Sequence, residues 1–314
     1  MEPVMHPSPY LLEVNNLTTR FDITDGFFKR TSSRVHAVED ISFQIKRGET
    51  LSLVGESGCG KTTTGRTIMG LQDATSGEIL FNGQSVLEHS REERLAFCRS
   101  VQMIFQDPYS SLNPRMSVYD TLAEPIRVHN LLQQKNVEAR IADLLEKVNL
   151  KPHFASRFPH ELRGGQRQRS SIARALALDP KMIICDEAVS ALDVTIKAQV
   201  INLLMDLQSN LVLSFLFISH DMAVVERISH RVAVMYLGRI VEIGPRAAVF
   251  ENPIHEYTKK LLSAVPVADP ALRRTERNIE VDEIPSAVRP LDYAPPVLTY
   301  NEVSPGHLVA SEAA

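Results

Sequence analysis

The amino-acid sequence predicts an α/β protein built on a mostly parallel β-sheet with helices on both faces. Short runs of apolar, β-branched residues alternate with helix-like stretches between about residues 11 and 265. Such near-continuous apolar strands are typical of a parallel sheet that is buried on both faces. The clearest predicted strands are LSLV at 51–54, VQMIF at 101–105, MIIC at 182–185, SFLFI at 214–218 and RVAVM at 231–235.

The strand pattern is interrupted in the middle of the chain and ends near residue 265. Strand signals vanish between residues 117 and 161, and residues 137–148 have helical spacing of apolar positions, which predicts an inserted helical subdomain at about 116–165. Residues 276–314 hold five prolines and few periodic apolar positions. They are either an extended tail on the surface or a small appendage that contacts a partner. We therefore expect a domain at 1–265 and a C-terminal extension at 266–314.

The composition excludes several classes of protein. The 34 basic residues are outnumbered by 38 acidic ones, whereas nucleic-acid binders usually have a basic excess, so no nucleic-acid partner is expected. The three cysteines lie far apart without CxxC spacing, which argues against disulfides and metal clusters. The sequence has no apolar run of about 18 residues and no signal peptide at its start. We therefore expect the chain to stay in the cytoplasm.

A phosphate-binding pattern, GxxxxGK[ST], occurs at residues 55–62, between a predicted strand and a predicted helix. Glycines let the backbone approach a polyphosphate, and the helix start adds partial positive charge. Lys61 would reach the β- and γ-phosphates, and the Thr62 hydroxyl would ligate Mg²⁺. A chance glycine turn is the alternative, against which the flanking elements argue. The pattern predicts that Mg·ATP is bound by Gly55, Glu56, Ser57, Gly58, Cys59, Gly60, Lys61, Thr62 and Thr63.

Two adjacent carboxylates follow the apolar run at 182–185. Successive strand residues point to opposite sides, so the two acids have different tasks. Asp186 would hold the magnesium shell, and Glu187 would act as general base toward water. Two surface acids at a strand end are the alternative, which the phosphate loop disfavours. No NKxD pattern for guanine is present, which points to ATP rather than GTP.

A second helix start carries glycines and a glutamine. Gly164, Gly165 and Gln166 open an Ala-rich helix and make a second anion-facing N-terminus. One triphosphate rarely needs two such sites. We therefore expect this one to serve the nucleotide of a neighbouring subunit.

With these residues in place, the sequence resembles the nucleotide-binding subunit of an ATP-binding-cassette (ABC) transporter over about residues 11–265. The motifs occur in the family's order: the phosphate loop, FQDP at 105–108, LRGGQ at 162–166, DE at 186–187, SALD at 190–193 and ISHD at 218–221. The resemblance implies a P-loop NTPase fold: an ABC nucleotide-binding domain with a RecA-like core, an antiparallel β edge and the inserted helical subdomain.

Longer segments resemble ABC importers of oligopeptides, dipeptides and glutathione. They are GESGCGK at 55–61, FQDPYSSLNPR at 105–115, ICDEAVSALDV at 184–194, NPIHEYT at 252–258 and VSPGHLVA at 303–310. This implies an ATPase, peripheral on the cytoplasmic face of the inner membrane, that energises peptide import. Its partners would be two membrane permease subunits, a second ABC ATPase subunit and, indirectly, a periplasmic solute-binding protein.

Three alternative functions remain open. The first alternative is an impaired or regulatory nucleotide-binding subunit. The second is an importer ATPase for another small solute, and the third is an ABC ATPase of DNA repair or translation. The last would predict paired cassettes, coiled-coil arms, a zinc site or a basic face, none of which the sequence shows.

The resemblance also assigns roles to single residues. Gln106 would contact Mg²⁺ or water at the entry to the helical insert, His220 would bond the γ-phosphate and steady the attacking water, and Asp193 would contribute to the nucleotide site. The alternatives are a helix-capping glutamine and a structural histidine. The expected catalytic residues are Lys61, Gln106, Glu187 and His220, and the expected magnesium ligands are Thr62, Gln106 and Asp186.

Two further residues are assigned near the nucleotide. Phe21 is the candidate for stacking on adenine. The alternatives are that Phe27 or Phe28 stacks there instead, or that Phe21 is only a core residue. Cys59 would fill a variable position of the loop. Because loop amides and Lys61 favour a thiolate, we expect the Cys59 thiol to be somewhat acidified.

Three departures from the family pattern stand out. Arg163 stands where the family's signature usually has a serine, which would bond the partner's γ-phosphate. Glu256 replaces a usual proline, and the tail lacks the cysteine cluster of some relatives, so no iron–sulfur centre is expected. With one cassette in this sequence, the second would come from another chain. Arg163 would either obstruct the partner's site by its bulk or compensate by placing positive charge on the γ-phosphate. Because we expect obstruction, we expect a heterodimer rather than a homodimer.

Overall fold

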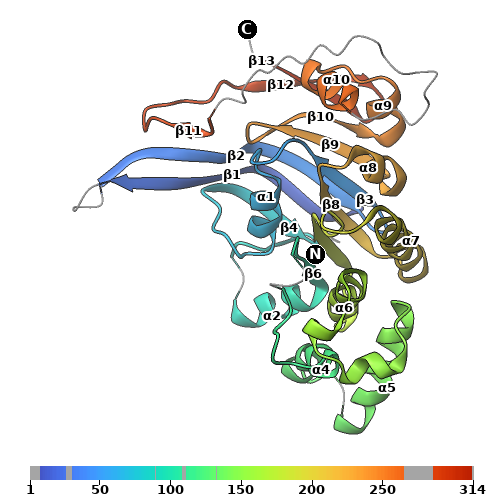
Figure 1. The fold of residues 1–314 in the computed structure, drawn as a ribbon. Coiled ribbons are helices and arrows are strands. Elements are labelled where there is room, and N and C mark those ends of the chain that lie inside the picture. The colour runs from blue at the N-terminus through green and yellow to red at the C-terminus, as the bar shows by residue number, and fades with distance from the viewer. Residues whose placement is uncertain are drawn as a thin grey trace, which may run out of the picture.

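The computed structural model describes residues 8–25, 30–88, 90–107, 111–131, 133–264 and 286–312. Its larger sheet has eight strands in the spatial order β12-β13-β10-β9-β3-β8-β7-β6 (Figure 1). These strands are β3 (Thr50–Val54), β6 (Val101–Ile104), β7 (Met182–Asp186), β8 (Ser214–Ser219), β9 (Arg231–Tyr236), β10 (Arg239–Pro245), β12 (Leu298–Ser304) and β13 (His307–Glu312).

The five strands β6, β7, β8, β3 and β9 are parallel, as the apolar runs predict. Their residues alternate between apolar cores on the two faces of the sheet because side chains of a strand point to opposite faces. Phe215 and Phe217 of β8 belong to a core shared with α6 (Gly164–Leu176) and α7 (Val194–Leu211). Leu216 and Ile218 belong to a core shared with α1 (Lys61–Ile68) and the second sheet. The central strands are therefore buried on both faces.

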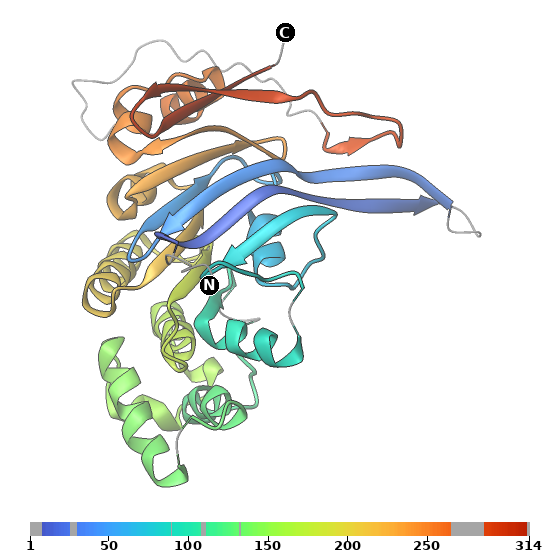
Figure 2. The ribbon, with the colours of Figure 1, turned by 180° about the vertical axis from the view of Figure 1, so that it is seen from behind.

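The second sheet is antiparallel and has the order β11-β2-β1-β4-β5. Its strands are β1 (Tyr10–Asp25), β2 (Arg30–Lys46), β4 (Ser76–Phe81), β5 (Gln84–Ser85) and β11 (Val288–Arg289). The long β1 and β2 pair along almost their whole length, and their far end projects beyond the rest of the molecule (Figure 2). This sheet is the antiparallel β edge that the resemblance implies.

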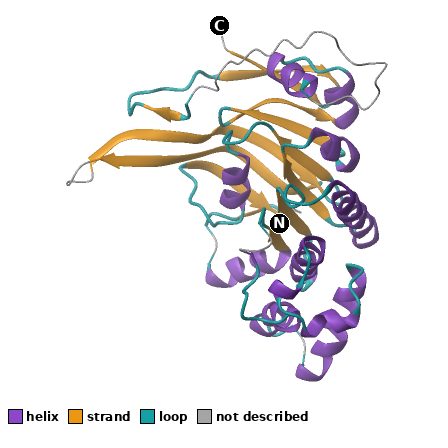
Figure 3. Cartoon of the chain, in the orientation of Figure 1, coloured by secondary structure: helices purple, strands orange, loops and turns teal. Residues whose placement is uncertain are grey.

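Helices occupy the chain between β6 and β7 (Figure 3). They are α4 (Val118–Val128), α5 (Gln134–Lys147), the short 3₁₀ helices η1 (Pro152–Ser156) and η2 (Pro159–Glu161), and α6. Ser117 caps α4 by accepting a hydrogen bond from the amide of Asp120 (3.1 Å). The buried face of α5 is formed by Val137, Ile141, Leu144 and Leu145, at helical spacing. α2 (Arg91–Ser100) precedes β6, and α8 (Met222–Ile228) follows β8. None of the described helices is long and apolar enough to cross a lipid bilayer.

The C-terminal part pairs with both sheets. After β10 come α9 (Arg246–Glu251) and α10 (Glu256–Ser263); then β11 pairs with β2, and the β12–β13 hairpin pairs with β10. The described residues 286–312 are extended and mostly exposed, and hydrogen bonds join them to both sheets. The sequence did not reveal β12 because it is an exposed edge strand without alternating burial, or β13 because its apolar run, at 308–310, is only three residues long.

Substituting the core residue Phe217 tests the two-sided burial of β8. Phe217→Ala removes a fully buried ring from the core beneath α6 and α7. We expect the free energy of unfolding to fall by about 3–5 kcal/mol, measured by urea denaturation. Leu71→Ala is the matched control, because Leu71 is 57% exposed, and should change stability by less than about 0.5 kcal/mol. Equal effects of the two substitutions would contradict this arrangement of the core.

Candidate functional site

The phosphate loop joins the buried strand β3 to α1. The loop lies so close to neighbouring backbone that two positions require glycine. A Cβ atom on Gly55 (φ 150°) would lie 2.1 Å from the carbonyl oxygen of Met235, and one on Gly60 (φ 107°) would lie 2.1 Å from that of Ala37. The backbone of β9 and β2 therefore fixes the path of the loop.

Lys61 lies inside the loop. Its side chain is buried, and Nζ donates hydrogen bonds to the carbonyl oxygens of Gly55 and Glu56, both at 2.7 Å. Ser57 and Gly58 are exposed, and among the described side chains none caps α1 at Gly60. The loop thus presents a buried ammonium group and an uncapped helix start, with Thr63 in the first turn. That arrangement fits the phosphates of a nucleotide.

The oxygen-bearing side chains of Thr62 and Asp186 lie together beside the loop. The Thr62 hydroxyl donates to Asp186 Oδ1 at 2.8 Å. Burial raises the pKa of the Asp186 carboxyl, although the Thr62 hydrogen bond opposes this effect. Within the described residues, no three His, Cys, Asp or Glu side chains form a metal cluster. A cation here would be held by this pair and by oxygens of the nucleotide, which is the ligand set that Mg²⁺ prefers.

Glu187 lies between Gln106 and His220. Gln106 Nε2 donates to Glu187 Oε2 (2.8 Å), and His220 Nδ1 lies 3.1 Å from Glu187 Oε1. The three residues follow the ends of β6, β7 and β8, so parallel pairing brings them together. Glu187 has a φ of 48°, in the left-handed region, and its amide donates to the carbonyl oxygen of Ile218 (3.0 Å). Its carboxylate is therefore oriented by partners on both oxygens.

The second glycine-bearing helix start is separate from the loop. A cavity of about 740 Å³ is lined by Arg163, Gly164, Gly165, Gln166 and Asp193, and by no residue of the phosphate loop. The amide of the exposed Arg163 donates to the side-chain oxygen of Gln166 (2.9 Å). The structure therefore divides the predicted site residues into two groups on one chain.

Phe21 lies on β1 opposite Val35 of β2 and is half-buried. Two residues earlier, the Thr19 hydroxyl lies 3.2 Å from that of Thr67 in α1, which brings this part of β1 against the helix that follows the loop. Phe27 and Phe28 lie outside the described residues. Adenine stacking on Phe21 stays a prediction.

The expected acidity of Cys59 is wrong. Its side chain is buried, and burial raises the pKa of the thiol, although the neighbouring Lys61 opposes this effect. Lys61 Nζ lies 3.6 Å from the sulfur. The sequence shows the neighbouring cation but not the loss of water around the thiol, and burial outweighs the charge.

Tyr257 is a residue of the site that was not recognised from the sequence. Its hydroxyl oxygen accepts a hydrogen bond from the amide of Glu56 at 2.9 Å. The NPIHEYT segment contains it, but nothing in that segment predicts contact with a loop 201 residues away.

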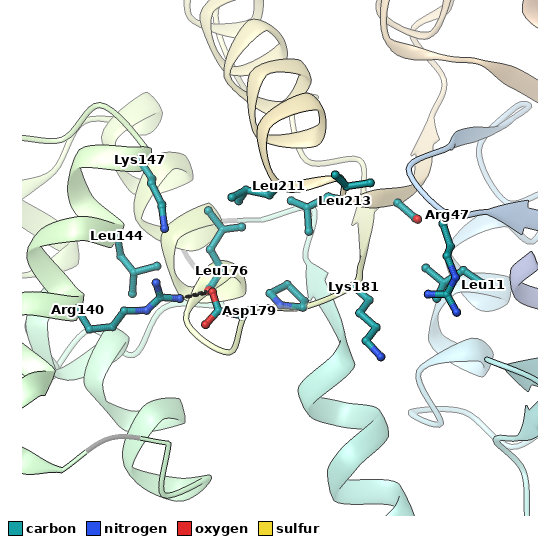
Figure 4. Close-up of a pocket in the computed structure, with 13 residues that line it drawn as sticks. Leu11, Arg47, Arg140, Leu144, Lys147, Leu176, Asp179, Lys181, Leu211 and Leu213 are labelled. Atoms are coloured by element: carbon teal, nitrogen blue, oxygen red, sulfur yellow. Dashed lines mark hydrogen bonds and ion pairs between the residues drawn. The ribbon is translucent and has the colours of Figure 1, made fainter.

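A further cavity, of about 390 Å³, holds none of the predicted residues (Figure 4). It lies between α5, the loop after α6 and the end of α7. Arg140 and Lys147 lie on one side of it, and Arg47 and Lys181 lie on the other. This cavity is not part of the candidate nucleotide site.

Comparison with known families agrees with this geometry. Residues 38–190 match the family described as ABC transporter. Residues 241–288 match the family described as Oligopeptide/dipeptide transporter, C-terminal region. Residues 38–190 therefore form an ABC transporter domain.

Among curated proteins, the chain is similar to the glutathione import ATP-binding protein GsiA. It is 57% identical to that of Escherichia coli (strain K12) over 300 residues, which cover 96% of this chain and 48% of the relative. It is 55% identical to that of Pectobacterium atrosepticum over 305 residues, which cover 97% and 49%. The chain thus spans about half the length of these relatives.

Solved structures confirm the predicted fold class. CbiO1 from Clostridium perfringens, part of the ABC transporter complex cbiONQ, superimposes with a TM-score of 0.67 at 28% identity, covering 78% of this chain and 92% of that one. The ATP-binding cassette MJ0796, solved as a dimer bound to ADP and Pi, gives 0.66 at 24% identity, covering 75% and 98%.

The reactivity of Cys59 tests the pKa direction. Because the thiolate is the nucleophile and burial raises the pKa of this thiol, we expect slow maleimide labelling at neutral pH, with a rate that still rises above pH 9.0. Labelling at Cys59 and at the half-buried Cys98 is followed by peptide mass spectrometry, with Cys59→Ser as control. Fast labelling that levels off well below pH 9.0 would show an acidified thiol instead.

Proposed function

We propose that this chain binds Mg·ATP at residues 55–63 and hydrolyses it. One observation carries the proposal: Glu187, held between Gln106 and His220, lies beside the Thr62–Asp186 pair at one edge of the parallel sheet. A phosphate loop, a pair of magnesium ligands and an oriented carboxylate are the parts that hydrolysis of a nucleoside triphosphate needs.

Each residue has a separate task in this proposal. Lys61 and the loop amides hold the phosphates, and Thr62, Asp186 and Gln106 hold Mg²⁺, which supplies positive charge to phosphoryl oxygens when bound. A Glu187 carboxylate oxygen accepts the proton of the attacking water. His220, bonded to Glu187, keeps that carboxylate in place and stabilises the developing charge.

Peptide import is the proposed use of this hydrolysis. The similarity to glutathione import ATP-binding proteins and the match to the peptide-transporter C-terminal region support it. The chain would lie peripherally on the cytoplasmic face of the inner membrane, with two permease subunits as partners and a periplasmic solute-binding protein as an indirect one. The nucleotide-binding domain would extend to about residue 265, with its helical insert at 116–165, followed by the C-terminal extension.

A second cassette would complete the site. Arg163, Gly164, Gly165, Gln166 and Asp193 lie apart from this chain's own loop, which supports a head-to-tail arrangement in which they cover the nucleotide of the other cassette. Arg163 is exposed at the helix start, where a bulky cation would meet that nucleotide. We therefore propose a heterodimer whose partner supplies a serine at the corresponding position.

An impaired or regulatory subunit is the second candidate. Arg163 favours it, because the residue removes a hydroxyl donor from the partner's site. The intact group of Gln106, Glu187 and His220 on this chain favours hydrolysis at its own loop.

Two substitutions separate nucleotide binding from hydrolysis. Lys61→Ala removes the ammonium group inside the loop, and we expect ATP affinity to fall about tenfold or more. Glu187→Gln keeps the loop intact, and we expect ATP binding to persist while turnover falls by about 10²–10⁴. Binding is measured by equilibrium titration, and turnover is measured in the reconstituted complex. Glu226→Gln, at an exposed acid of α8, is the control and should change neither. Unchanged turnover with Glu187→Gln would remove Glu187 from the role of base.

Arg163→Ser tests the asymmetry between the two sites. We expect it to raise ATP turnover at the partner's loop by up to about 10²-fold, because it restores one donor near the transferring phosphoryl group. The measurement uses complexes in which only the partner's loop is active. Arg99→Ser, an exposed arginine at the end of α2, controls for the lost charge. Equal or lower turnover with serine would show that Arg163 is a functional replacement.

A further inference from the structure

One peptide group of the phosphate loop, between Gly55 and Glu56, is held at both ends. Its N–H donates to the Tyr257 hydroxyl oxygen at 2.9 Å. Its carbonyl oxygen, that of Gly55, accepts a hydrogen bond from Lys61 Nζ at 2.7 Å. Tyr257 and Lys61 are therefore linked through a single rigid plane.

This peptide group needs an external restraint. Gly55 has a φ of 150°, a conformation open to glycine, and glycine leaves the adjoining peptide plane more freedom to rotate than other residues do. A rotated plane would point its carbonyl oxygen away from Lys61. The ammonium group would then lose one of its two carbonyl acceptors in the loop.

Tyr257 is well placed to supply that restraint. Its side chain is buried, and its ring packs on the ring of Tyr236 at the end of β9, with 4.3 Å between centroids. Burial raises the pKa of its hydroxyl, so the group stays neutral. In the turn after Tyr236, the Gly238 amide donates to the carbonyl oxygen of Cys59 (3.0 Å), which fixes the other end of the loop.

The start of α10, which carries Tyr257, is anchored by a buried carboxylate. Glu242 of β10 is fully buried and accepts hydrogen bonds from the amides of Ile254 and His255, both at 3.0 Å. His307 of the β12–β13 hairpin lies with Nε2 2.7 Å from the same carboxylate. A buried carboxylate requires such partners, so these contacts fix the segment that leads into α10.

We propose that Tyr257 is a positioning residue for Lys61. By fixing the Gly55–Glu56 peptide group, its hydroxyl holds the ammonium group where the loop receives phosphates and so raises the affinity for nucleoside triphosphate. The C-terminal region thereby contributes to the nucleotide site. This inference rests on the proposed binding of ATP at this loop.

Tyr257→Phe removes the hydroxyl and keeps the ring. We expect ATP affinity of the full chain to fall about two- to tenfold, the range for loss of one hydrogen bond. In nucleotide-free protein, hydrogen exchange at the Glu56 amide should become faster, because that amide loses its acceptor. Tyr236→Phe is the matched control: it removes a hydroxyl from the ring that packs on Tyr257, and no hydrogen bond among the described residues depends on that hydroxyl. It should leave both measurements unchanged.

A double substitution separates positioning of Lys61 from a general structural role. In a Lys61→Met background, Tyr257→Phe should cause no further loss of ATP affinity, because no ammonium group remains to be positioned. An equal loss in both backgrounds would overturn the inference. The inference would also be overturned if the wild-type chain bound ATP and the Tyr257→Phe variant bound it with the same affinity. That result would leave the proposed function intact. A wild-type chain that binds no ATP would overturn the proposed function itself.

Discussion

The parallel pairing of β3, β7 and β8 decides where the candidate site of this protein lies. Asp186 at the end of β7 is in register with Ile218 of β8, and Val54 at the end of β3 is in register with Ser219. The chain leaves all three strands at the same edge, because parallel strands share a direction. The loop, the two carboxylates and His220 therefore meet there, although Thr62 and Asp186 lie 124 residues apart in the sequence and Glu187 and His220 lie 33 apart. The apolar cores on both faces keep this edge in place.

The surroundings of Asp186 and Glu187 give two adjacent carboxylates different properties. Asp186 is buried and bonded to a hydroxyl, whereas Glu187 turns through a left-handed backbone conformation and meets an amide and an imidazole. Burial disfavours a bare negative charge on Asp186, and a cation would remove that penalty. Different environments at neighbouring acids are a general route to separate chemical roles.

Local patterns in the sequence predicted the fold class and the composition of the loop. The apolar runs became the parallel strands, and the motif residues lie at their ends. Contacts between distant segments were not predictable in this way. Tyr257 reaches Glu56 only because β9 and β10 carry α10 back to the loop. The pKa of Cys59 was mispredicted because the sequence shows its charged neighbour but not its burial. The strands β11 and β12 were missed because they are exposed edge strands without an apolar face, and β13 was missed because its apolar run, at 308–310, is only three residues long.

The C-terminal segment ties the two sheets of the molecule together. β11 is paired with β2 of the antiparallel sheet, and β13 is paired with β10 of the larger one. At the first contact the His36 amide donates to the carbonyl oxygen of Ala287 (2.9 Å), and at the second His307 bonds the buried Glu242. A segment paired with both sheets opposes rotation of one sheet against the other, because such a rotation would stretch the residues between β11 and β13.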